Sequence, residues 1–252
     1  MVKIYFIGAG PGDPELLTIK AKKIIKKADI VIYAGSLINK NILKFAKKSA
    51  NLYDSSRMNL EEILGIIRKE KSTDKIVARV HSGDPSLYGA IGEQIDFCEK
   101  IGAEYEVIPG VISFCAGAAA LKQELTLPGI TQSVIITRVS GRTKVPKKEN
   151  LQALAKIRAT LIIFLSVDRI DEIVSKLISG YNKNTPAAVV YRASWPDEKI
   201  ISGTLSNIAP KVKKEGIKKQ ALIFVGEVLG KKGFKKSALY DKTFSHAYRK
   251  VD

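Results

Sequence analysis

The 252-residue sequence contains only two cysteines, Cys98 and Cys115, and no C-x-x-C motif. This excludes a disulfide scaffold and a zinc site built on paired Cys and His residues. No apolar run reaches the roughly 18 residues that a membrane-spanning helix needs, and the opening stretch MVKIYFIGAGPGDPE has no leader-like charge pattern. We therefore expect a protein of the reducing cytoplasm with no membrane partner.

Histidine is also scarce, with His81 and His246 alone. The chain has no G-x-S-x-G motif, no P-loop and no evident carboxylate pair, so the equipment of a hydrolase is missing. Group transfer by a cofactor that carries its own reactivity is the chemistry that remains. No metal site is expected, and no catalytic acid or base can be named from the sequence.

Positive charge is abundant: 42 Lys and Arg against 25 Asp and Glu give a formal net charge of +17. A basic surface attracts nucleic acid, anionic membranes or polyanionic small molecules. The lysines are dispersed, however, in segments such as KAKKIIKK and KVKKEGIKK, and fit the outer faces of helices. A solvated lysine-rich surface therefore competes with a functional interpretation.

Strand-like and helical segments alternate along the chain, which predicts an α/β protein with mostly parallel sheets covered on both faces. The strand-like runs are 2–7, 30–33, 76–80 and 105–108, then 133–137, 159–165, 187–191 and 220–225. The helical patterns are 16–27, 41–48, 60–70 and 92–101, with a small-residue helix at 116–124.

Pro109 and Gly110 interrupt this alternation, so we expect two α/β lobes of similar size joined near 110–118. The predicted limits are 1–112 for the amino-terminal lobe, 113–230 for the carboxy-terminal lobe and 231–252 for a basic tail. The cleft between two such lobes is a preferred ligand site.

The loop GAGPGDP follows the first strand and precedes a helix, as in nucleotide-binding folds. Its glycines are spaced G-x-G-x-G rather than G-x-G-x-x-G, and Asp29 lies at the wrong end of the second strand to bind a ribose. These departures exclude a dinucleotide site of the usual kind.

A second Gly-Asp-Pro occurs in RVHSGDPSLYGA, again after a strand. Two such loops after two parallel strands should share the carboxyl edge of the sheet, where ligands bind. Here Gly83 would allow a ligand to approach the backbone, and Asp84 would accept hydrogen bonds from ribose hydroxyls or a cationic group. One Gly-Asp-Pro is usually only a turn, but two at one edge favour a site.

A third unusual stretch, TQSVIITRVSGRTKVP, places Arg138, Arg142 and Lys144 on a glycine-containing loop after a strand. Arg is suited to bidentate recognition of carboxylates. A solvated or structural role for each of these residues alone is equally compatible with the sequence.

Together these stretches closely resemble the tetrapyrrole methyltransferases. The similarity covers almost the whole chain, through IYFIGAGPGDPELLTIKA, ADIVIYAGSLI, VHSGDPSLYGAIGEQ, VIPGVISFCAGAAAL, VVYRASWPDEKI and KQALIFVGEVL. It implies two α/β lobes with a cofactor cleft between them, a fold distinct from the Rossmann-like methyltransferases. It also implies S-adenosylmethionine as cofactor, S-adenosylhomocysteine as product, and a homodimer.

Two further segments, ELTLPGITQSVIITRVSGRTKVP and SALYDKTFSHAYR, resemble the branch that methylates C11 of precorrin-4 or cobalt-precorrin-4 in cobalamin biosynthesis. The product would be precorrin-5 or cobalt-precorrin-5A. The related uroporphyrinogen methyltransferases carry an acidic residue after the tyrosine of the second strand. This chain has Ala34 after Tyr33, which argues against that reaction.

The resemblance also implies site residues. Family members often have Thr in place of Ile112, so only backbone contacts carry over there. The anionic tetrapyrrole would be bound by Arg138, Arg142 and Lys144, with Arg57, His81 and Arg192 as further candidates. The implied cofactor residues are Pro11, Ser82, Gly83, Asp84, Leu87, Ile112, Ser113, Leu165, Ala193, Ser194, Ala221 and Leu222.

Other functions remain open on the sequence alone. A methyltransferase of the same fold could act on another precorrin position or on ribosomal RNA, although dispersed lysines do not form the basic stripe expected for RNA, and no nucleic acid partner is expected. A protein that only binds and sequesters tetrapyrroles is the non-enzymatic alternative. The sequence does not distinguish a cobalt-containing from a metal-free substrate.

Overall fold

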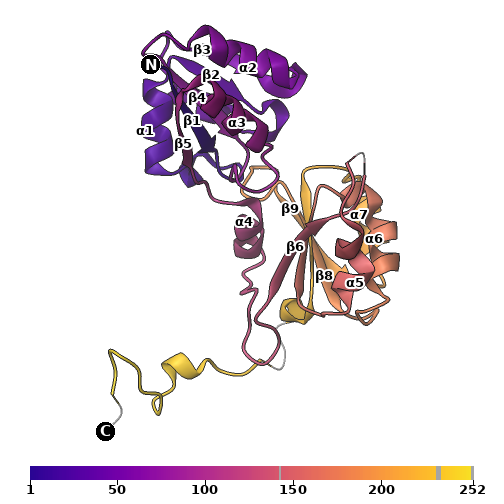
Figure 1. Ribbon diagram of the computed structural model, residues 1–252. Coiled ribbons are helices and arrows are strands. Elements are labelled where there is room, and N and C mark those ends of the chain that lie inside the picture. Colours follow the sequence, from indigo (N-terminus) through magenta and orange to yellow (C-terminus); the bar gives the residue numbers. More distant parts are fainter. Residues whose placement is uncertain (142, 231–233, 251–252) are drawn as a thin grey trace. The chain divides into compact units, whose positions relative to one another are not determined.

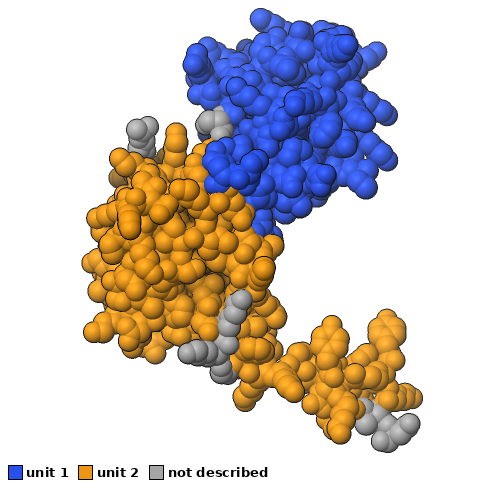
Figure 2. Space-filling view, turned by 180° about the vertical axis from the view of Figure 1, so that it is seen from behind, with its two compact units in different colours: residues 1–116, 192–197 blue, residues 117–191, 198–252 orange. Residues whose placement is uncertain are grey.

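The computed structural model describes residues 1–141, 143–230 and 234–250. Its internal contacts divide the chain into two compact units (Figures 1 and 2). Unit 1 comprises Met1–Ala116 with Arg192–Asp197, and unit 2 comprises Gly117–Tyr191 with Glu198–Asp252. The short segment Arg192–Asp197 therefore belongs by its contacts to unit 1, although the rest of unit 1 ends at Ala116, some 75 residues earlier in the sequence.

Unit 1 is built on a five-stranded sheet in which every pairing is parallel. Its strand order is β3-β2-β4-β1-β5. The strands are β1 (Lys3–Gly8), β2 (Ile30–Tyr33), β3 (Asn51–Asp54), β4 (Ile76–His81) and β5 (Glu104–Ile108). This confirms the parallel α/β expectation for the first half of the chain, with β3 as a strand that the sequence did not indicate.

Apolar side chains alternate across this sheet and form a core on each face. On one face, Ile7 packs with Ala21 and Ile25 of α1 (Ile19–Lys27). On the other, Phe6 packs with buried residues of α2 (Leu60–Lys69) and α3 (Gly92–Ile101). The period-2 alternation of β1 thus covers both faces of the sheet with helices, as Figure 1 shows.

Local signals set the helix ends. Asn59 and Glu62 form a reciprocal capping box at the start of α2. At the end of α3, Gly102 adopts the left-handed backbone with φ of 67°. The segment expected as a helix over 41–48 is instead a 3-10 helix, η3 (Lys40–Phe45), and η3 packs against α1.

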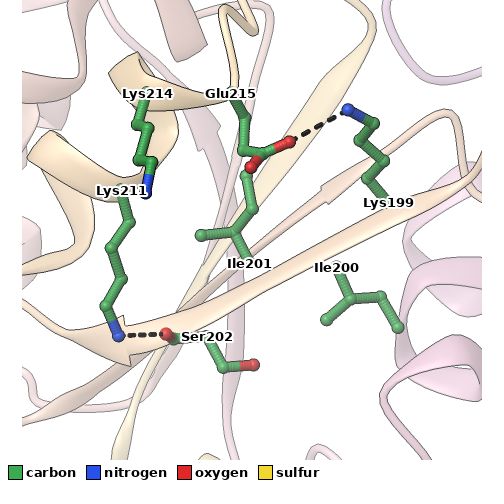
Figure 3. Close-up of a pocket in the computed structure, with 7 residues that line it drawn as sticks. All are labelled: Lys199, Ile200, Ile201, Ser202, Lys211, Lys214 and Glu215. Atoms are coloured by element: carbon green, nitrogen blue, oxygen red, sulfur yellow. Dashed lines mark hydrogen bonds and ion pairs between the residues drawn. The ribbon is translucent and has the colours of Figure 1, made fainter.

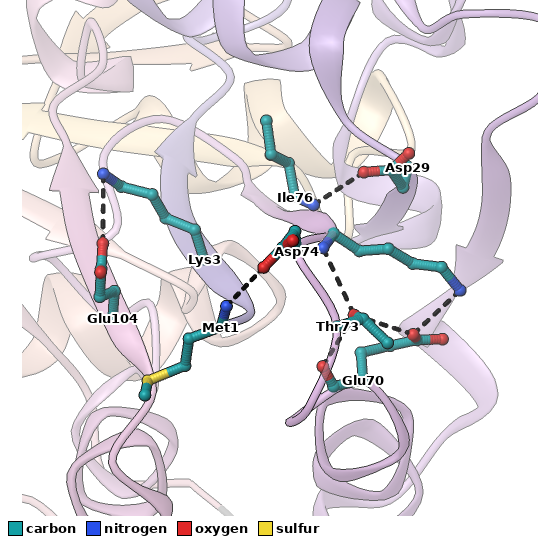
Figure 4. Close-up of polar contacts among 9 residues, drawn as sticks. Met1, Lys3, Asp29, Glu70, Thr73, Asp74, Ile76 and Glu104 are labelled. Carbon is teal, nitrogen blue, oxygen red and sulfur yellow. Dashed lines mark hydrogen bonds and ion pairs between the residues drawn. The ribbon is translucent and has the colours of Figure 1, made fainter.

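The amino-terminal edge of the first sheet is held by exposed polar contacts (Figure 4). The amino group of Met1 lies 2.7 Å from Asp74 Oδ1, and Lys3 Nζ lies 3.4 Å from Glu104 Oε2. The backbone N–H of Ile76 donates to Asp29 Oδ2 at 2.8 Å. These contacts fasten the starts of the strands and leave the opposite edge to the glycine loops.

Unit 2 also has five strands, in the order β6-β7-β10-β8-β9. Only β6 and β7 pair in parallel; β10 and β9 run antiparallel to their neighbours. The expectation of a mostly parallel sheet is wrong here. Residues 192–198, which join β8 to β9, are too few for the crossover that parallel strands require. The strands are β6 (Val134–Arg138), β7 (Thr160–Phe164), β8 (Pro186–Tyr191), β9 (Lys199–Thr204) and β10 (Ala221–Val225).

One core of unit 2 joins the sheet to three helices: α5 (Leu151–Ala155), α6 (Ile170–Leu177) and α7 (Ile208–Lys214). The small-residue helix α4 (Ser113–Ala120) begins and ends earlier than the expected 116–124. A Cβ on Gly117 would lie 2.6 Å from Phe224 Cζ, so α4 needs glycine there. The remaining 3-10 turns are η1 (Pro14–Leu16), η2 (Gly35–Leu37), η4 (Ser55–Arg57), η5 (Lys147–Glu149), η6 (Val167–Arg169), η7 (Glu227–Gly230) and η8 (Ala238–Tyr240).

The described part of the tail, 234–250, has little regular structure but is not random. Arg249 Nη2 donates to the carbonyls of Leu239 and Phe244, each at 3.0 Å. Tyr240 and Tyr248 are 82% and 96% exposed. Among the described helices, none has the length and apolar character to cross a membrane.

Candidate functional site

The two Gly-Asp-Pro loops follow the neighbouring strands β1 and β4. In the strand order β3-β2-β4-β1-β5, the connection from β1 runs towards β2, whereas the connection from β4 runs in the opposite direction, towards β5. The helices that make these connections, α1 and α3, cover opposite faces of the sheet. The carboxyl ends of β1 and β4 therefore form a topological switch point, the place where open α/β sheets bind ligands.

Backbone hydrogen bonds join the two loops at this point. Gly83 N donates to Gly10 O at 2.8 Å, and Gly10 N donates to Gly83 O at 3.2 Å. Both glycines have the left-handed backbone, with φ of 76° at Gly10 and 64° at Gly83. Glycine adopts this conformation without strain, which explains why both loops carry it.

A third loop, at Gly110 after β5, meets the other two. Gly110 N donates to Asp84 Oδ2 at 2.9 Å, while Asp84 Oδ1 accepts from Ser86 N at 2.8 Å. A Cβ on Gly110 would lie 2.2 Å from Gly83 O, and one on Gly8 would lie 2.5 Å from Gly110 N. We call Gly8, Gly10, Gly83 and Gly110 the glycine cradle. The three chain segments that contain these four glycines can approach one another closely because glycine has no side chain.

The chain that follows the third loop lies next to Gly83. A Cβ placed on Gly83 would meet nothing nearer than Ser113 N at 3.7 Å and Ile112 Cα at 3.9 Å. The structure thus brings three of the predicted cofactor residues, Gly83, Ile112 and Ser113, to one place. A ligand at this position would contact mainly backbone atoms.

The segment Arg192–Asp197 lies against the first loop of unit 1. Asp13 N donates to Ser194 Oγ at 3.0 Å, and Trp195 Nε1 donates to Pro11 O at 2.8 Å. Two further predicted residues, Pro11 and Ser194, are therefore in the same neighbourhood, with Ala193 buried beside Ser194. The sequence reasoning missed Trp195, although a lone tryptophan inside RASWPD was the available signal.

The remaining predicted cofactor residues are placed as follows. Ser82 and Leu87 flank the second Gly-Asp-Pro and are half-buried. In unit 2, Leu165 follows β7 with φ of 53° and is 69% exposed, an uncommon combination for a large apolar residue. Ala221 and Leu222 are the buried first residues of β10. Their contribution to a cofactor site stays a prediction.

Of the predicted substrate residues in the arginine loop, Arg138 is engaged with the backbone. Its Nη1 donates to Thr143 O and its Nη2 donates to Lys144 O, each at 3.0 Å. Lys144 is exposed, and Arg142 lies outside the described residues. Arg138 therefore holds the carbonyls of Thr143 and Lys144, and these bonds use two of its five N–H donors.

The other three candidates differ in character. Arg57 is exposed at the end of η4. Arg192 has its guanidinium 3.9 Å from the centre of the Trp195 ring, and its Nη1 lies 2.5 Å from Asp197 Oδ2. Arg57 is therefore accessible to an anion, whereas the Arg192 guanidinium is already engaged by Trp195 and Asp197.

His81 is 4% exposed at the end of β4. Burial, with a smaller effect of the Arg79 charge, lowers the pKa of His81 to about 3. Burial also lowers the pKa of the Arg79 guanidinium to about 10; its Nε donates to Gln94 Oε1 at 3.1 Å and its Nη1 to Ile32 O at 3.3 Å. His81 is thus neutral and offers hydrogen bonding rather than positive charge.

An open groove of about 470 Å³ lies on unit 2 between β9 and α7 (Figure 3). Two of its lysines are already paired with groups in the groove. Lys199 Nζ lies 2.9 Å from Glu215 Oε2, and Lys211 Nζ donates to Ser202 O at 2.8 Å. None of the lining residues belongs to the glycine cradle, so this groove is not the candidate site. Within the described ranges, no three His, Cys, Asp or Glu side chains gather as metal ligands.

Residues 3–209 match the model of the Tetrapyrrole (Corrin/Porphyrin) Methylases, and the chain belongs to that family. Its membership confirms the resemblance, the fold and the class of enzyme expected from the sequence.

Individual relatives are more specific. The chain is 58% identical over 249 residues to the cobalt-precorrin-4 C(11)-methyltransferase of Methanocaldococcus jannaschii, covering 98% of this chain and 96% of that protein. A solved cobalt precorrin-4 methyltransferase superposes with a TM-score of 0.88 at 43% identity, covering 90% of this chain and 95% of that one. The uroporphyrin-III C-methyltransferase of Thermus thermophilus, solved with S-adenosylhomocysteine, gives a TM-score of 0.75 at 30% identity, with coverages of 90% and 99%.

Proposed function

We propose that this protein transfers the methyl group of S-adenosylmethionine to C11 of cobalt-precorrin-4 in cobalamin biosynthesis, giving cobalt-precorrin-5A and S-adenosylhomocysteine. The observation that carries this proposal is the 58% identity, over nearly the full length of both chains, to a cobalt-precorrin-4 C(11)-methyltransferase. The metal-free precorrin-4 is the alternative acceptor on the same site.

The residues of the glycine cradle fit this cofactor. The backbone of Ile112 and Ser113 lies next to Gly83 with no Gly83 side chain between them, and the loop at Pro11 is held by Ser194 and Trp195. The cofactor supplies a sulfonium whose methyl group is electrophilic. The chain supplies backbone contacts that orient the cofactor and exclude water around the reacting carbon. We assign this binding to the twelve residues predicted from the sequence.

The substrate side rests on charge. A tetrapyrrole with several acetate and propionate groups is strongly anionic, and the net charge of +17 favours its approach. We assign carboxylate binding to Arg138, Arg142 and Lys144 on the loop after β6, with Arg57 and Arg192 as further cations and His81 as a neutral hydrogen-bonding group. Arg138 acts in part by holding the carbonyls of Thr143 and Lys144.

We further propose a cytoplasmic homodimer. The unpaired thiols of Cys98 and Cys115 are typical of a reducing compartment. Exposed Tyr240 and Tyr248 in the tail offer aromatic surface that a second copy of the chain would cover. Light scattering on the full chain and on a Tyr240→Ser/Tyr248→Ser variant tests this: we expect a dimer for the first and a weakened dimer for the second. A monomeric full chain at micromolar concentration would contradict it.

Turnover tests the proposed reaction. The purified chain is incubated with S-adenosylmethionine and either cobalt-precorrin-4 or metal-free precorrin-4, and the product mass is followed. We expect addition of one methyl group, faster with the cobalt substrate. Faster turnover of the metal-free substrate would move the protein to the other route. Transfer to neither, with methylation of ribosomal RNA fragments instead, would overturn the choice of acceptor.

A further inference from the structure

The segment Arg192–Asp197 holds the first glycine loop at two points. Trp195 Nε1 donates to Pro11 O, and Ser194 Oγ accepts from Asp13 N. These two bonds bracket Gly12, the residue between them. The backbone of the loop is therefore fixed on both sides of one glycine by one short segment distant in sequence.

Gly12 has a steric reason to be glycine. A Cβ at this position would lie 2.1 Å from both Cδ1 and Nε1 of Trp195, far inside any permitted contact. The indole ring lies directly on the Gly12 backbone. Any side chain there would push the ring away and break the bond from its N–H to Pro11 O.

The segment contains two non-glycine residues with an uncommon backbone conformation. Arg192 and Ser194 have φ of 47° and 68°, in the left-handed region that side chains disfavour. The Arg192 guanidinium stacks over the Trp195 ring at 3.9 Å and is paired with Asp197 at 2.5 Å. A cation over an indole face is attractive, so Arg192 helps to hold the ring that lies against Gly12.

The loop held in this way leads directly to the cradle. Pro11 follows Gly10, and Gly10 exchanges two backbone hydrogen bonds with Gly83. Gly83 precedes Asp84, whose carboxylate accepts from Gly110 N. Displacement of the indole would therefore loosen the first loop, which is bonded to the second, and the second is in turn bonded to the third.

We propose that Trp195 is a positioning residue for the cofactor: its indole N–H and ring fix the loop at Pro11 and Gly12 in the shape that binds S-adenosylmethionine. This inference rests on the proposed cofactor site at the glycine cradle. Because Trp195 is the chain's only tryptophan, its fluorescence should also report occupation of that site.

The test uses the full chain and Trp195→Phe, which keeps an aromatic ring and removes the N–H. Calorimetry should show affinity for S-adenosylhomocysteine lowered about threefold to tenfold, the effect of one net hydrogen bond, with the KM for the tetrapyrrole unchanged. Gly12→Ala, which displaces the ring itself, should lose more affinity than Trp195→Phe. In the unaltered chain, saturating S-adenosylhomocysteine should shift or quench the tryptophan emission.

Tyr105→Phe is the matched control. It removes one aromatic side-chain hydrogen bond in the same unit, from Tyr105 Oη to Glu99 Oε1 at 2.6 Å, away from the cradle, and should leave affinity unchanged. The positioning role would be overturned if Trp195→Phe bound S-adenosylhomocysteine as tightly as the unaltered chain. It would also be overturned if the substitution raised the KM for the tetrapyrrole by the same factor by which it weakened cofactor binding. Tryptophan emission that does not change when S-adenosylhomocysteine binds would also contradict it. Failure of the unaltered chain to bind S-adenosylhomocysteine would instead overturn the proposed cofactor site.

Discussion

Asp84 links two loops of the glycine cradle, and its removal should weaken cofactor binding more than substrate binding. Its Oδ2 accepts from Gly110 N at 2.9 Å and its Oδ1 from Ser86 N at 2.8 Å. A hydrogen bond to a charged group contributes about 1.5–3 kcal/mol. In Asp84→Ala both N–H groups lose this acceptor, and the bond between the second and third loops is gone.

Part of that energy is recovered because Gly110 is only half-buried and Ser86 is exposed, so water can reach the freed N–H groups. We therefore expect a loss of about 1.4–2.8 kcal/mol in binding of S-adenosylhomocysteine, a tenfold to hundredfold weaker affinity. Asp84→Asn keeps one acceptor oxygen, so its affinity for S-adenosylhomocysteine should lie between those of the unaltered chain and Asp84→Ala. Calorimetry gives the affinity, and initial rates give the KM for the tetrapyrrole, which should change little.

Asp13 provides the matched control, because it occupies the same position in the other Gly-Asp-Pro. Among the described residues, its carboxylate accepts only from Glu15 N, two residues away, at 2.8 Å. Asp13→Ala therefore removes a local bond and no bond between loops, and its effect on affinity should be smaller. Equal effects of the two substitutions, or an unchanged affinity in Asp84→Ala, would refute this account of the cradle.

Three further predictions concern other parts of the chain. Gly110→Ala would place a Cβ 2.2 Å from Gly83 O and should lower S-adenosylhomocysteine affinity at least about tenfold. Gly65→Ala in α2 has open space around it, so it should leave affinity unchanged and add about 0.5–1 kcal/mol to the free energy of unfolding. Calorimetry measures the affinities and urea denaturation the stabilities; equal affinities of the two variants would contradict the role assigned to the glycine cradle. Arg142→Ala should raise the KM for the tetrapyrrole and spare cofactor affinity in the same assays; equal loss of both would mean a structural role. Because the pKa of His81 is lowered from 6.5 to about 3 in the folded state, the unfolded chain binds the proton more readily, and the free energy of unfolding should fall by about 1.4 kcal/mol per pH unit below 6.5 from this residue. Urea denaturation at pH 6.5 and pH 5 gives the free energy of unfolding at each pH. Its decrease between the two should be smaller in His81→Gln and unchanged in the tail variant His246→Gln. Equal decreases in the two variants would show that the buried His81 ring is not the cause.

The sequence was sufficient to predict the two Gly-Asp-Pro loops at one edge of a parallel sheet. This follows from the strand before each loop and from the geometry of parallel strands, whose carboxyl ends share an edge. The bond from Gly110 N to Asp84 Oδ2 was beyond prediction, because residues 26 apart meet only once the strand order β4-β1-β5 is known.

Other features needed the tertiary structure for similar reasons. The short strands β3 and β9 have exposed residues that give no clear alternation, so their pairing partners define them. The assignment of 192–197 to unit 1 depends on contacts of Trp195 with residues some 180 positions away. Arg138 could be predicted as a functional cation, but its bonds to the carbonyls of Thr143 and Lys144 depend on how the following loop folds back.

The position of the new methyl group tests the central claim most directly. Cobalt-precorrin-4 is incubated with the protein and S-adenosylmethionine labelled with carbon-13 in the transferred methyl, and the product is examined by mass spectrometry and NMR. We expect a single labelled methyl bonded to C11 and a stoichiometric amount of S-adenosylhomocysteine. A label at another ring carbon, or no transfer by a chain that binds S-adenosylhomocysteine, would contradict the account.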